Sequence, residues 1–268
     1  MLRANCEANE WFDAERSTSH NNINYAFEWV NDGTGDITIK VDHFIFSDTQ
    51  LAEVPTYGWL LESRSIIPHL YDLAEENIEY LTKNLECIFT HDVRLAEIPG
   101  FKHVKPNAAP WVLDYSPKEK TKLASMISSD KALSEGHFLR LDYVDKFRDS
   151  VDLYGRGFNE IDRKEDGLQD YMFSIAIENA NYDSYFTEKL TDCFATRTVP
   201  IFYGTKGVEK YFEPEGIIYL DDNFSVEDLS PELYESMTDA IEENWLLAGS
   251  FGTAEDDMTV RYFKEYII

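Results

Sequence analysis

The chain has 268 residues, enough for one large or two small α/β domains, and 51 acidic against 24 basic residues give it a net charge of −27. Such a surface repels phosphate backbones and anionic lipids, which argues against nucleic acid and acidic membranes as partners. A solvated acidic shell explains the charge without any function. A site for an anionic ligand must therefore gather the few basic residues locally.

The cysteines and the beginning of the chain indicate where the protein works. Cys6, Cys87 and Cys193 lie far apart and lack metal-ligand spacing, so we expect free thiols in a reducing compartment. Residues 1–17 are polar, without the apolar core of a signal peptide, and no run of about 18 apolar residues occurs. We therefore expect a cytoplasmic protein with no transmembrane anchor and no metal site.

The first half of the chain shows one strand–helix–strand pattern. The first 35 residues are polar and end in the turn-rich stretch NDGTGD. Apolar periodicity then predicts, in chain order, a strand, a second strand, a helix and a third strand, at 37–46, 57–63, 68–85 and 86–92. This unit is typical of a parallel sheet.

The second half alternates strands and helices after a proline-rich segment at 106–120, which we interpret as a linker. The predicted strands are 122–130, 151–157, 173–179, 198–204 and 216–222. The predicted helices are 133–147, 187–196, 207–212 and the region from about 230 onward. We predict an α/β protein with two Rossmann-like domains facing a cleft, and C-terminal helices closing back. The expected divisions are 1–112, 113–235 and 236–268.

An unusual group of polar residues surrounds the turn after the predicted strand at 173–179. A helix beginning near Thr187 would offer backbone N–H groups and its positive dipole end to a diphosphate, with Thr187 as cap and Lys189 as an added charge. Glu188 would repel phosphate, so vicinal ribose hydroxyls suit its carboxylate better. The pattern thus indicates nucleotide diphosphate recognition, although an exposed charge pair at a helix start explains it too.

Two arginines and a histidine near other strand ends are further candidates. Arg140 and Arg156 have the right chemistry to stabilise a leaving diphosphate, and a surface salt bridge is the alternative for each. His137 is a candidate base, or simply a helix-capping residue. The acid pair 221–222 is better explained as a turn cap than as a metal ligand.

The stretch from 171 to 204, YMFSIAIENANYDSYFTEKLTDCFATRTVPIFYG, resembles the donor-binding motif of the α-1,3/4-fucosyltransferases. Tyr-x-Phe, Glu-Asn, Tyr-x-Thr-Glu-Lys and Val-Pro recur in that family, and the similarity extends over about 122–222. The resemblance implies a GT-B architecture, GDP-fucose as donor, a glycan acceptor and inversion at the anomeric carbon. It implies no required cofactor, although a divalent metal could stimulate the reaction.

The resemblance also assigns roles in the donor site. It implies that Glu188 binds the ribose diol and that Lys189 and Arg140 bind the phosphates. It also implies that Tyr185 lines the phosphate pocket and that Glu178 and Asn179 shape the donor site. Two positions depart from the family pattern. Ala180 stands where many members have Ser or Thr, and Phe186 replaces a smaller residue, so both could shift the choice of sugar.

An inverting transfer also needs a general base on the face of the sugar away from the leaving group. By resemblance, the base is expected in the first domain, and we assign it to Glu62 in WLLESRS, at the end of a predicted strand. An ordinary strand-end acid is the alternative. Two other functions fit the same motif: transfer of a different GDP-sugar, and a catalytically silent module that binds nucleotide or glycan.

Overall fold

The computed structural model of the protein describes all residues except four short stretches, at 9–23, 50–51, 133–134 and 268. The chain forms two compact units. The first unit comprises Met1–Asn107, Asp183–Tyr185 and Gly252–Ile268, and the second comprises Ala108–Tyr182 and Phe186–Phe251.

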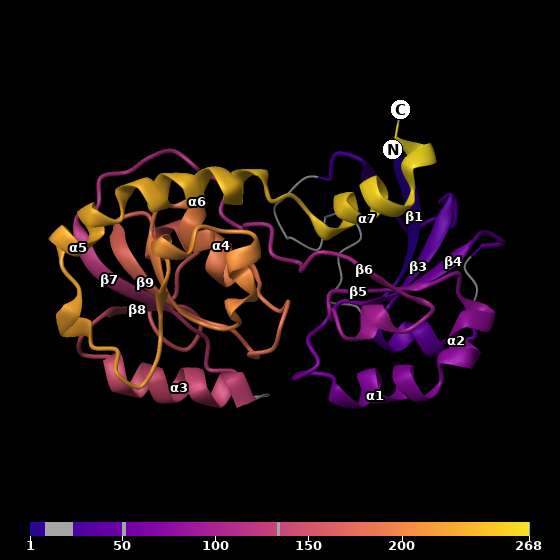
Figure 1. Ribbon diagram of the computed structural model, residues 1–268, viewed down its shortest axis with the longest axis horizontal. Helices are drawn as coiled ribbons and strands as arrows, with labels where there is room; N and C mark the ends of the chain where they lie inside the picture. The colour runs from indigo at the N-terminus through magenta and orange to yellow at the C-terminus, as the bar shows by residue number, and fades with distance from the viewer. Residues whose placement is uncertain (9–23, 50–51, 133–134, 268) are drawn as a thin grey trace. The chain divides into compact units, whose positions relative to one another are not determined.

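The first unit contains a six-stranded parallel sheet with strand order β2-β1-β3-β4-β5-β6 (Figure 1). Its strands are β1 (Leu2–Glu7), β2 (Phe27–Val30), β3 (Ile37–Val41), β4 (Thr56–Leu60), β5 (Ile88–Thr90) and β6 (Phe101–His103). Helices α1 (Pro68–Glu76) and α2 (Ile78–Asn84) cover one face, and α7 (Ala254–Tyr262) covers the other. Because both faces are covered, β3 is buried along its whole length.

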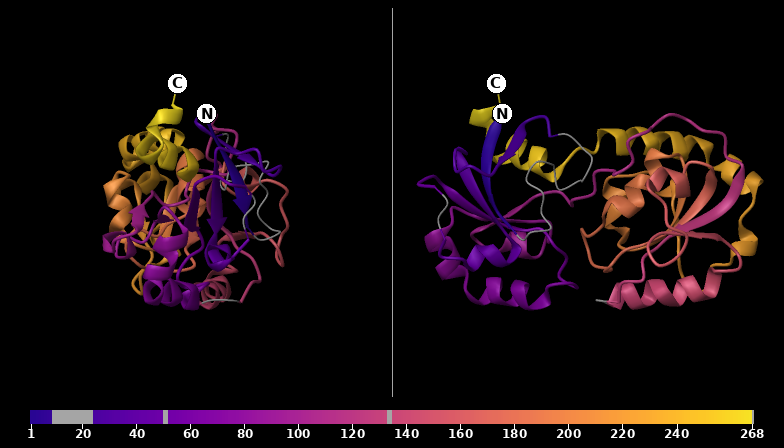
Figure 2. Two further views of the ribbon diagram at one scale, coloured as in Figure 1. Left: turned by 90° about the vertical axis from the view of Figure 1, so that its right-hand side faces the viewer. Right: turned by 180° about the vertical axis from the view of Figure 1, so that it is seen from behind.

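The second unit contains a five-stranded parallel sheet with strand order β11-β10-β9-β7-β8. Its strands are β7 (Lys122–Ile127), β8 (Asp152–Tyr154), β9 (Tyr171–Ile177), β10 (Val199–Tyr203) and β11 (Ile218–Tyr219). Its helices are α3 (Glu135–Phe147), α4 (Glu188–Ala195), α5 (Pro231–Ser236) and α6 (Thr238–Ser250). Helix α3 lies on one face of this sheet, and α4 and α6 lie on the other (Figure 2). The predicted α/β class with two parallel sheets is confirmed.

Several predicted elements differ in detail from the observed ones. Strands β1 and β2 lie in the polar first 35 residues, where the sequence pattern predicted none. The predicted helix over 68–85 breaks at Asn77 into α1 and α2. The predicted strand over 37–46 ends at Val41, and Asp42 takes a positive φ of 52° that begins a 3-10 turn. The predicted helix over 207–212 is instead a 3-10 turn at Lys206–Lys210.

The change from the first unit to the second follows Asn107, inside the predicted linker, whereas the expected division was after residue 112. Of the C-terminal helices, α6 belongs to the second unit and α7 to the first. Cys6, Cys87 and Cys193 are free thiols. Among the helices that the structure describes, none is long and apolar enough to cross a membrane.

Gly155 provides a direct test of how closely the strand ends pack in the second unit. It has a φ of +106°, and a Cβ atom there would lie 1.9 Å from the carbonyl oxygen of Ser128 at the end of β7. We expect Gly155→Ala to lower the free energy of unfolding by about 2 kcal/mol or more, measured by urea denaturation. The control is Gly249→Ala, because Gly249 lies in α6 with only ordinary contacts, and that change should be neutral or stabilising by up to about 1 kcal/mol. Equal stabilities of the two variants would contradict this packing.

Candidate functional site

Glu178 connects the end of β9 to the beginning of α4. Its side chain is fully buried, and its carboxylate accepts a 2.7 Å hydrogen bond from the Thr187 amide and bonds of 2.9 and 3.0 Å from the Thr187 hydroxyl. The Lys189 ammonium lies 3.5 Å away. Burial raises the pKa of Glu178 above its usual value, and the charge of Lys189 and the two Thr187 donors oppose that shift. Glu178 therefore fixes the loop that leads into α4.

The start of α4 is capped as the sequence predicted. The Thr187 hydroxyl accepts a hydrogen bond from the Lys189 amide at 3.4 Å, and the Lys189 ammonium donates to the same oxygen at 2.9 Å. The expectation that the first amides of this helix are free is wrong for Thr187 and Lys189, because Glu178 and the cap already accept from them. A diphosphate at this turn would therefore depend on side-chain cations more than on these amides.

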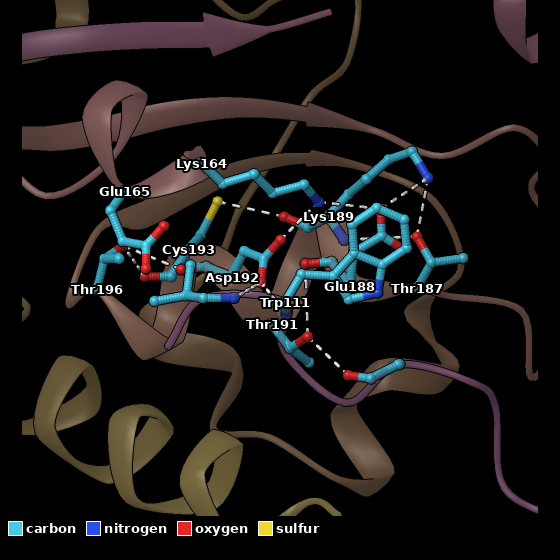
Figure 3. Close-up of polar contacts among 12 residues, drawn as sticks. Trp111, Lys164, Glu165, Thr187, Glu188, Lys189, Thr191, Asp192, Cys193 and Thr196 are labelled. Carbon is cyan, nitrogen blue, oxygen red and sulfur yellow. Dashed lines mark hydrogen bonds and ion pairs between the residues drawn. The ribbon is translucent and has the colours of Figure 1, made fainter. Parts of the chain in front are cut away.

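Glu188 is a carboxylate between two lysines, and its side chain is 12% exposed (Figure 3). Its Oε1 lies 3.1 Å from Nζ of Lys164 and 3.7 Å from Nζ of Lys189. Burial opposes ionisation, but the two ammonium groups outweigh it and lower the pKa of Glu188 to about 2. Glu188 is thus an ionised acceptor at neutral pH, as the assignment to ribose hydroxyls requires.

Lys164 was missed by the sequence analysis and is the cation closest to Glu188. Its Nζ also lies 2.6 Å from Oδ2 of Asp192, and 4.3 Å from the centre of the Trp111 ring. Burial tends to lower the pKa of Lys164, but the carboxylates of Asp192 and Glu188 outweigh it and raise that pKa above its usual value. The one signal in the sequence was the i, i+4 spacing of Glu188 and Asp192, which places both acids on one face of α4.

Carboxylates also hold the segment that leads into the second unit. The Trp111 and Val112 amides donate to Oδ1 of Asp192 at 2.6 and 3.0 Å. The Leu113 amide donates to Oε1 of Glu165 at 3.0 Å. The predicted linker is therefore fixed to the second unit along this stretch, and it carries the Trp111 ring to Lys164.

The start of α3 meets the loop after β9. Arg140 is buried, and its NH1 group donates to the side-chain oxygen of Asn179 at 3.4 Å. A Cβ atom at Gly136 would lie 2.3 Å from the carbonyl oxygen of Asn179, so the helix approaches the loop closely. The structure thus brings together Arg140 and Asn179, two of the residues that the sequence assigned to the donor site.

The pKa of His137 is shifted by the positive charges around it. Its side chain is buried, and burial together with the charges of Arg140, Lys131 and Lys189 lowers its pKa to about 4. The imidazole is therefore neutral at pH 7. The net charge of the chain is −27, so a site for an anionic ligand needs a local excess of positive charge. The three cations near His137 provide such an excess.

Other candidates lie elsewhere. Arg156 is exposed and pairs with the exposed Asp130 at 3.5 Å, so the surface salt bridge is the better explanation of its position. Tyr185 belongs to the first unit, where its ring lies 5.6 Å from that of His91. Phe186 is fully buried among aromatic rings of the second unit, which makes it a core residue.

Glu62 follows β4 in the first unit and is held by its neighbours. The Leu61 and Glu62 amides donate to Oδ1 of Asp42 at 2.8 and 3.2 Å, and the Tyr71 hydroxyl donates to the Glu62 carbonyl at 2.7 Å. Oε1 of Glu62 accepts from the Ser63 amide at 2.8 Å. Burial raises the pKa of Asp42 to about 7, which the sequence analysis did not anticipate. Within the described ranges, no cluster of three His, Cys, Asp or Glu side chains could hold a metal ion.

The comparisons with known proteins agree with this arrangement. Residues 117–242 match the C-terminal domain of glycosyltransferase family 10 (fucosyltransferase). The match runs from before β7 to the first turn of α6 and includes the Glu178–Lys189 turn. This part of the chain thus resembles the C-terminal domain of the family 10 glycosyltransferases. The resemblance to the fucosyltransferases is thereby confirmed for the half of the chain that carries the motif.

Curated fucosyltransferases extend the similarity over more of the chain. The α-(1,3)-fucosyltransferase FucT of Helicobacter pylori is 26% identical over 194 residues, which cover 70% of this chain and 37% of that protein. The human 4-galactosyl-N-acetylglucosaminide 3-α-L-fucosyltransferase 9 is 26% identical over 221 residues, covering 79% and 56%. The chain thus spans less than two thirds of the length of these relatives.

Solved structures give the fold of the whole chain. A crystal structure of an α1,3-fucosyltransferase with GDP-fucose superposes with a TM-score of 0.53 at 15% identity, over 99% of this chain and 90% of that one. A crystal structure of an α1,3-fucosyltransferase with GDP gives the same TM-score at 13% identity. The predicted GT-B fold class is confirmed. The roles of the individual site residues stay predictions.

The junction of Glu178 with Thr187 makes a testable contribution to stability. Thr187→Ala removes the cap of α4 and the hydroxyl that donates to a buried carboxylate, so we expect the free energy of unfolding to fall by about 2 kcal/mol. Thr187→Ser keeps the hydroxyl and should lose less than about 1 kcal/mol. The measurement is urea denaturation at pH 7. If serine and alanine cost the same, the hydroxyl does not have this role.

Proposed function

We propose that the protein is an inverting glycosyltransferase that moves fucose from GDP-fucose to a hydroxyl of a glycan, forming an α-1,3-type linkage. The observation that carries the proposal is Glu188, an ionised carboxylate beside Lys189 at the start of α4, within the part of the chain that matches family 10. The fucosyltransferase names of the relatives support the choice of sugar. We propose no cofactor beyond the donor, although a divalent metal could stimulate the reaction.

The donor chemistry divides between two kinds of group. The Glu188 carboxylate accepts hydrogen bonds from the two ribose hydroxyls of the nucleotide. Lys189 and Arg140 oppose the charge of the diphosphate, which increases in the transition state as GDP leaves. Asn179, bonded to Arg140, and Glu178, bonded to Thr187, shape the site around them.

The reaction is a single displacement. An oxygen of the acceptor hydroxyl attacks the anomeric carbon of fucose, the bond from that carbon to the GDP oxygen breaks, and the configuration inverts. Glu62 takes the proton of the attacking hydroxyl. GDP leaves with the bonding electron pair, and the two cations stabilise it.

Two further features of the protein refine the proposal. Ala180 is buried and stands where many family members have Ser or Thr, which favours transfer of a different GDP-sugar as the second candidate function. Turnover of GDP-fucose against GDP-mannose distinguishes the two. We also propose a cytoplasmic setting, because its reducing conditions keep the buried thiols of Cys87 and Cys193 free.

The assignment of Glu188 predicts a specific loss of nucleotide affinity. Glu188→Gln removes a charged acceptor, so we expect GDP to bind about 10 to 100 times more weakly, measured by isothermal titration calorimetry. The control is Glu232→Gln, an exposed residue of α5 in the same unit, which should leave the affinity unchanged. Wild-type affinity in the Glu188 variant would remove the carboxylate from the donor site.

The assignment of Glu62 predicts the opposite pattern. Glu62→Gln keeps the acceptor for the Ser63 amide but cannot take a proton, so kcat for fucose transfer should fall by about 10² or more. The affinity of this variant for GDP should stay within about threefold of the wild type. The control is Glu53→Gln, at an exposed residue, for which both kcat and the affinity for GDP should stay within about threefold of the wild type. A loss of GDP affinity in Glu62→Gln would instead make Glu62 a donor contact or a structural residue.

A further inference from the structure

Lys164 lies in a 3-10 turn before β9 and reaches two carboxylates of α4. Its Nζ is 3.1 Å from Oε1 of Glu188 and 2.6 Å from Oδ2 of Asp192 (Figure 3). The two acids are one helical turn apart, so a single ammonium group bridges them. We infer that Lys164 is a positioning residue that holds the Glu188 carboxylate in place for the ribose diol, an inference that rests on the proposed function.

The surroundings of Lys164 restrict where its ammonium group can move. Asp192, its closest partner, is itself fixed by the Trp111 and Val112 amides. The Trp111 ring lies 4.3 Å from Nζ, at a distance typical of a cation–π contact. A cation held by a fixed carboxylate and a ring can orient a second carboxylate, because its own position is already determined.

The two lysines near Glu188 therefore have different tasks. Lys189 bonds to the Thr187 hydroxyl at 2.9 Å and lies 3.7 Å from Glu188, whereas Lys164 lies 3.1 Å from Glu188. Lys189 stays with the cap, where the proposed diphosphate would bind. Lys164 contacts the acid that would bind the sugar of the nucleoside.

Removing Lys164 alone would leave Glu188 and the buried Asp192 without their shared cation, which costs stability. The test therefore uses Lys164→Met together with the double variant Lys164→Met/Asp192→Asn. In the double variant one carboxylate leaves with the ammonium, so the net charge of the three side chains stays at −1. Lys164→Arg is the conservative variant, because it keeps a charged donor in reach of both acids.

The experiment compares calorimetric affinities for GDP and 2′,3′-dideoxy-GDP, which share base and phosphates but differ in the diol. We expect the wild type to prefer GDP by about tenfold or more. In Glu188→Gln and in the Lys164→Met variants this preference should fall to about threefold or less, with little change in the affinity for the dideoxy compound. Lys164→Arg should retain a measurable part of the preference.

The pH dependence gives a second readout. The charged groups that face Glu188 are Lys164, Lys189, Asp192 and Glu178. With Lys164 present, the low pKa of Glu188 keeps the ratio of the two affinities constant from pH 7.5 to 5. Without it the pKa of Glu188 rises, so the ratio should fall as the pH is lowered. Protonation of the phosphates cancels in this ratio, because both ligands carry them.

The outcomes separate the inference from the proposed function. A wild-type preference that Glu188→Gln abolishes and the folded Lys164→Met variants keep would overturn the role of Lys164 alone. Equal losses for both nucleotides in those variants would show a merely structural role and overturn it as well. A wild type that binds neither nucleotide, or binds both equally, would overturn the ribose assignment and this inference together.

Discussion

The hydrogen bonds from Thr187 to the buried carboxylate of Glu178 determine the geometry of the whole site. They join the end of a central strand to the beginning of α4, and every other contact of the site is built outward from that junction. Because the helix start is fixed, Glu188 and Lys189 have defined positions, and Asp192 lies one turn further along. The cost of burying Glu178 is offset by the amide and the hydroxyl of Thr187, which make three hydrogen bonds to its carboxylate, and by a nearby ammonium group.

The distribution of charge connects this junction to function. The chain has 51 acidic and 24 basic residues, so its surface as a whole repels a nucleotide diphosphate. Within the second unit, however, Arg140, Lys131 and Lys189 all act on His137 and keep it neutral. Lys164 offsets the two acids of α4 that face it. The basic residues are few, and their placement makes one region suitable for an anion.

The sequence was sufficient for the alternation of strands and helices and for the cap at Thr187, because these depend on local periodicity and on spacing within a few residues. It was insufficient for β1, where Asn5 is fully buried yet bonded to the carbonyl of Ile37 and the amide of Gly35. In a sequence pattern, a buried polar residue whose hydrogen-bond partners are distant in the chain cannot be distinguished from a surface residue. Lys164 was missed for the same reason, since its two carboxylate partners follow it by a strand and a loop. The family motif identified Glu188 but not the side chain that holds it.

Donor binding in the proposed site depends on hydrogen bonds from the ribose to Glu188 and on contacts of the diphosphate with cationic side chains. The measurement that tests this most directly is a crystal structure of the protein with GDP bound. The account predicts both ribose hydroxyls within hydrogen-bond distance of the Glu188 carboxylate, and the phosphates beside Lys189 and Arg140, with Glu178 still bonded to Thr187. A nucleotide whose ribose lies away from Glu188, or whose phosphates contact neither cation, would contradict it.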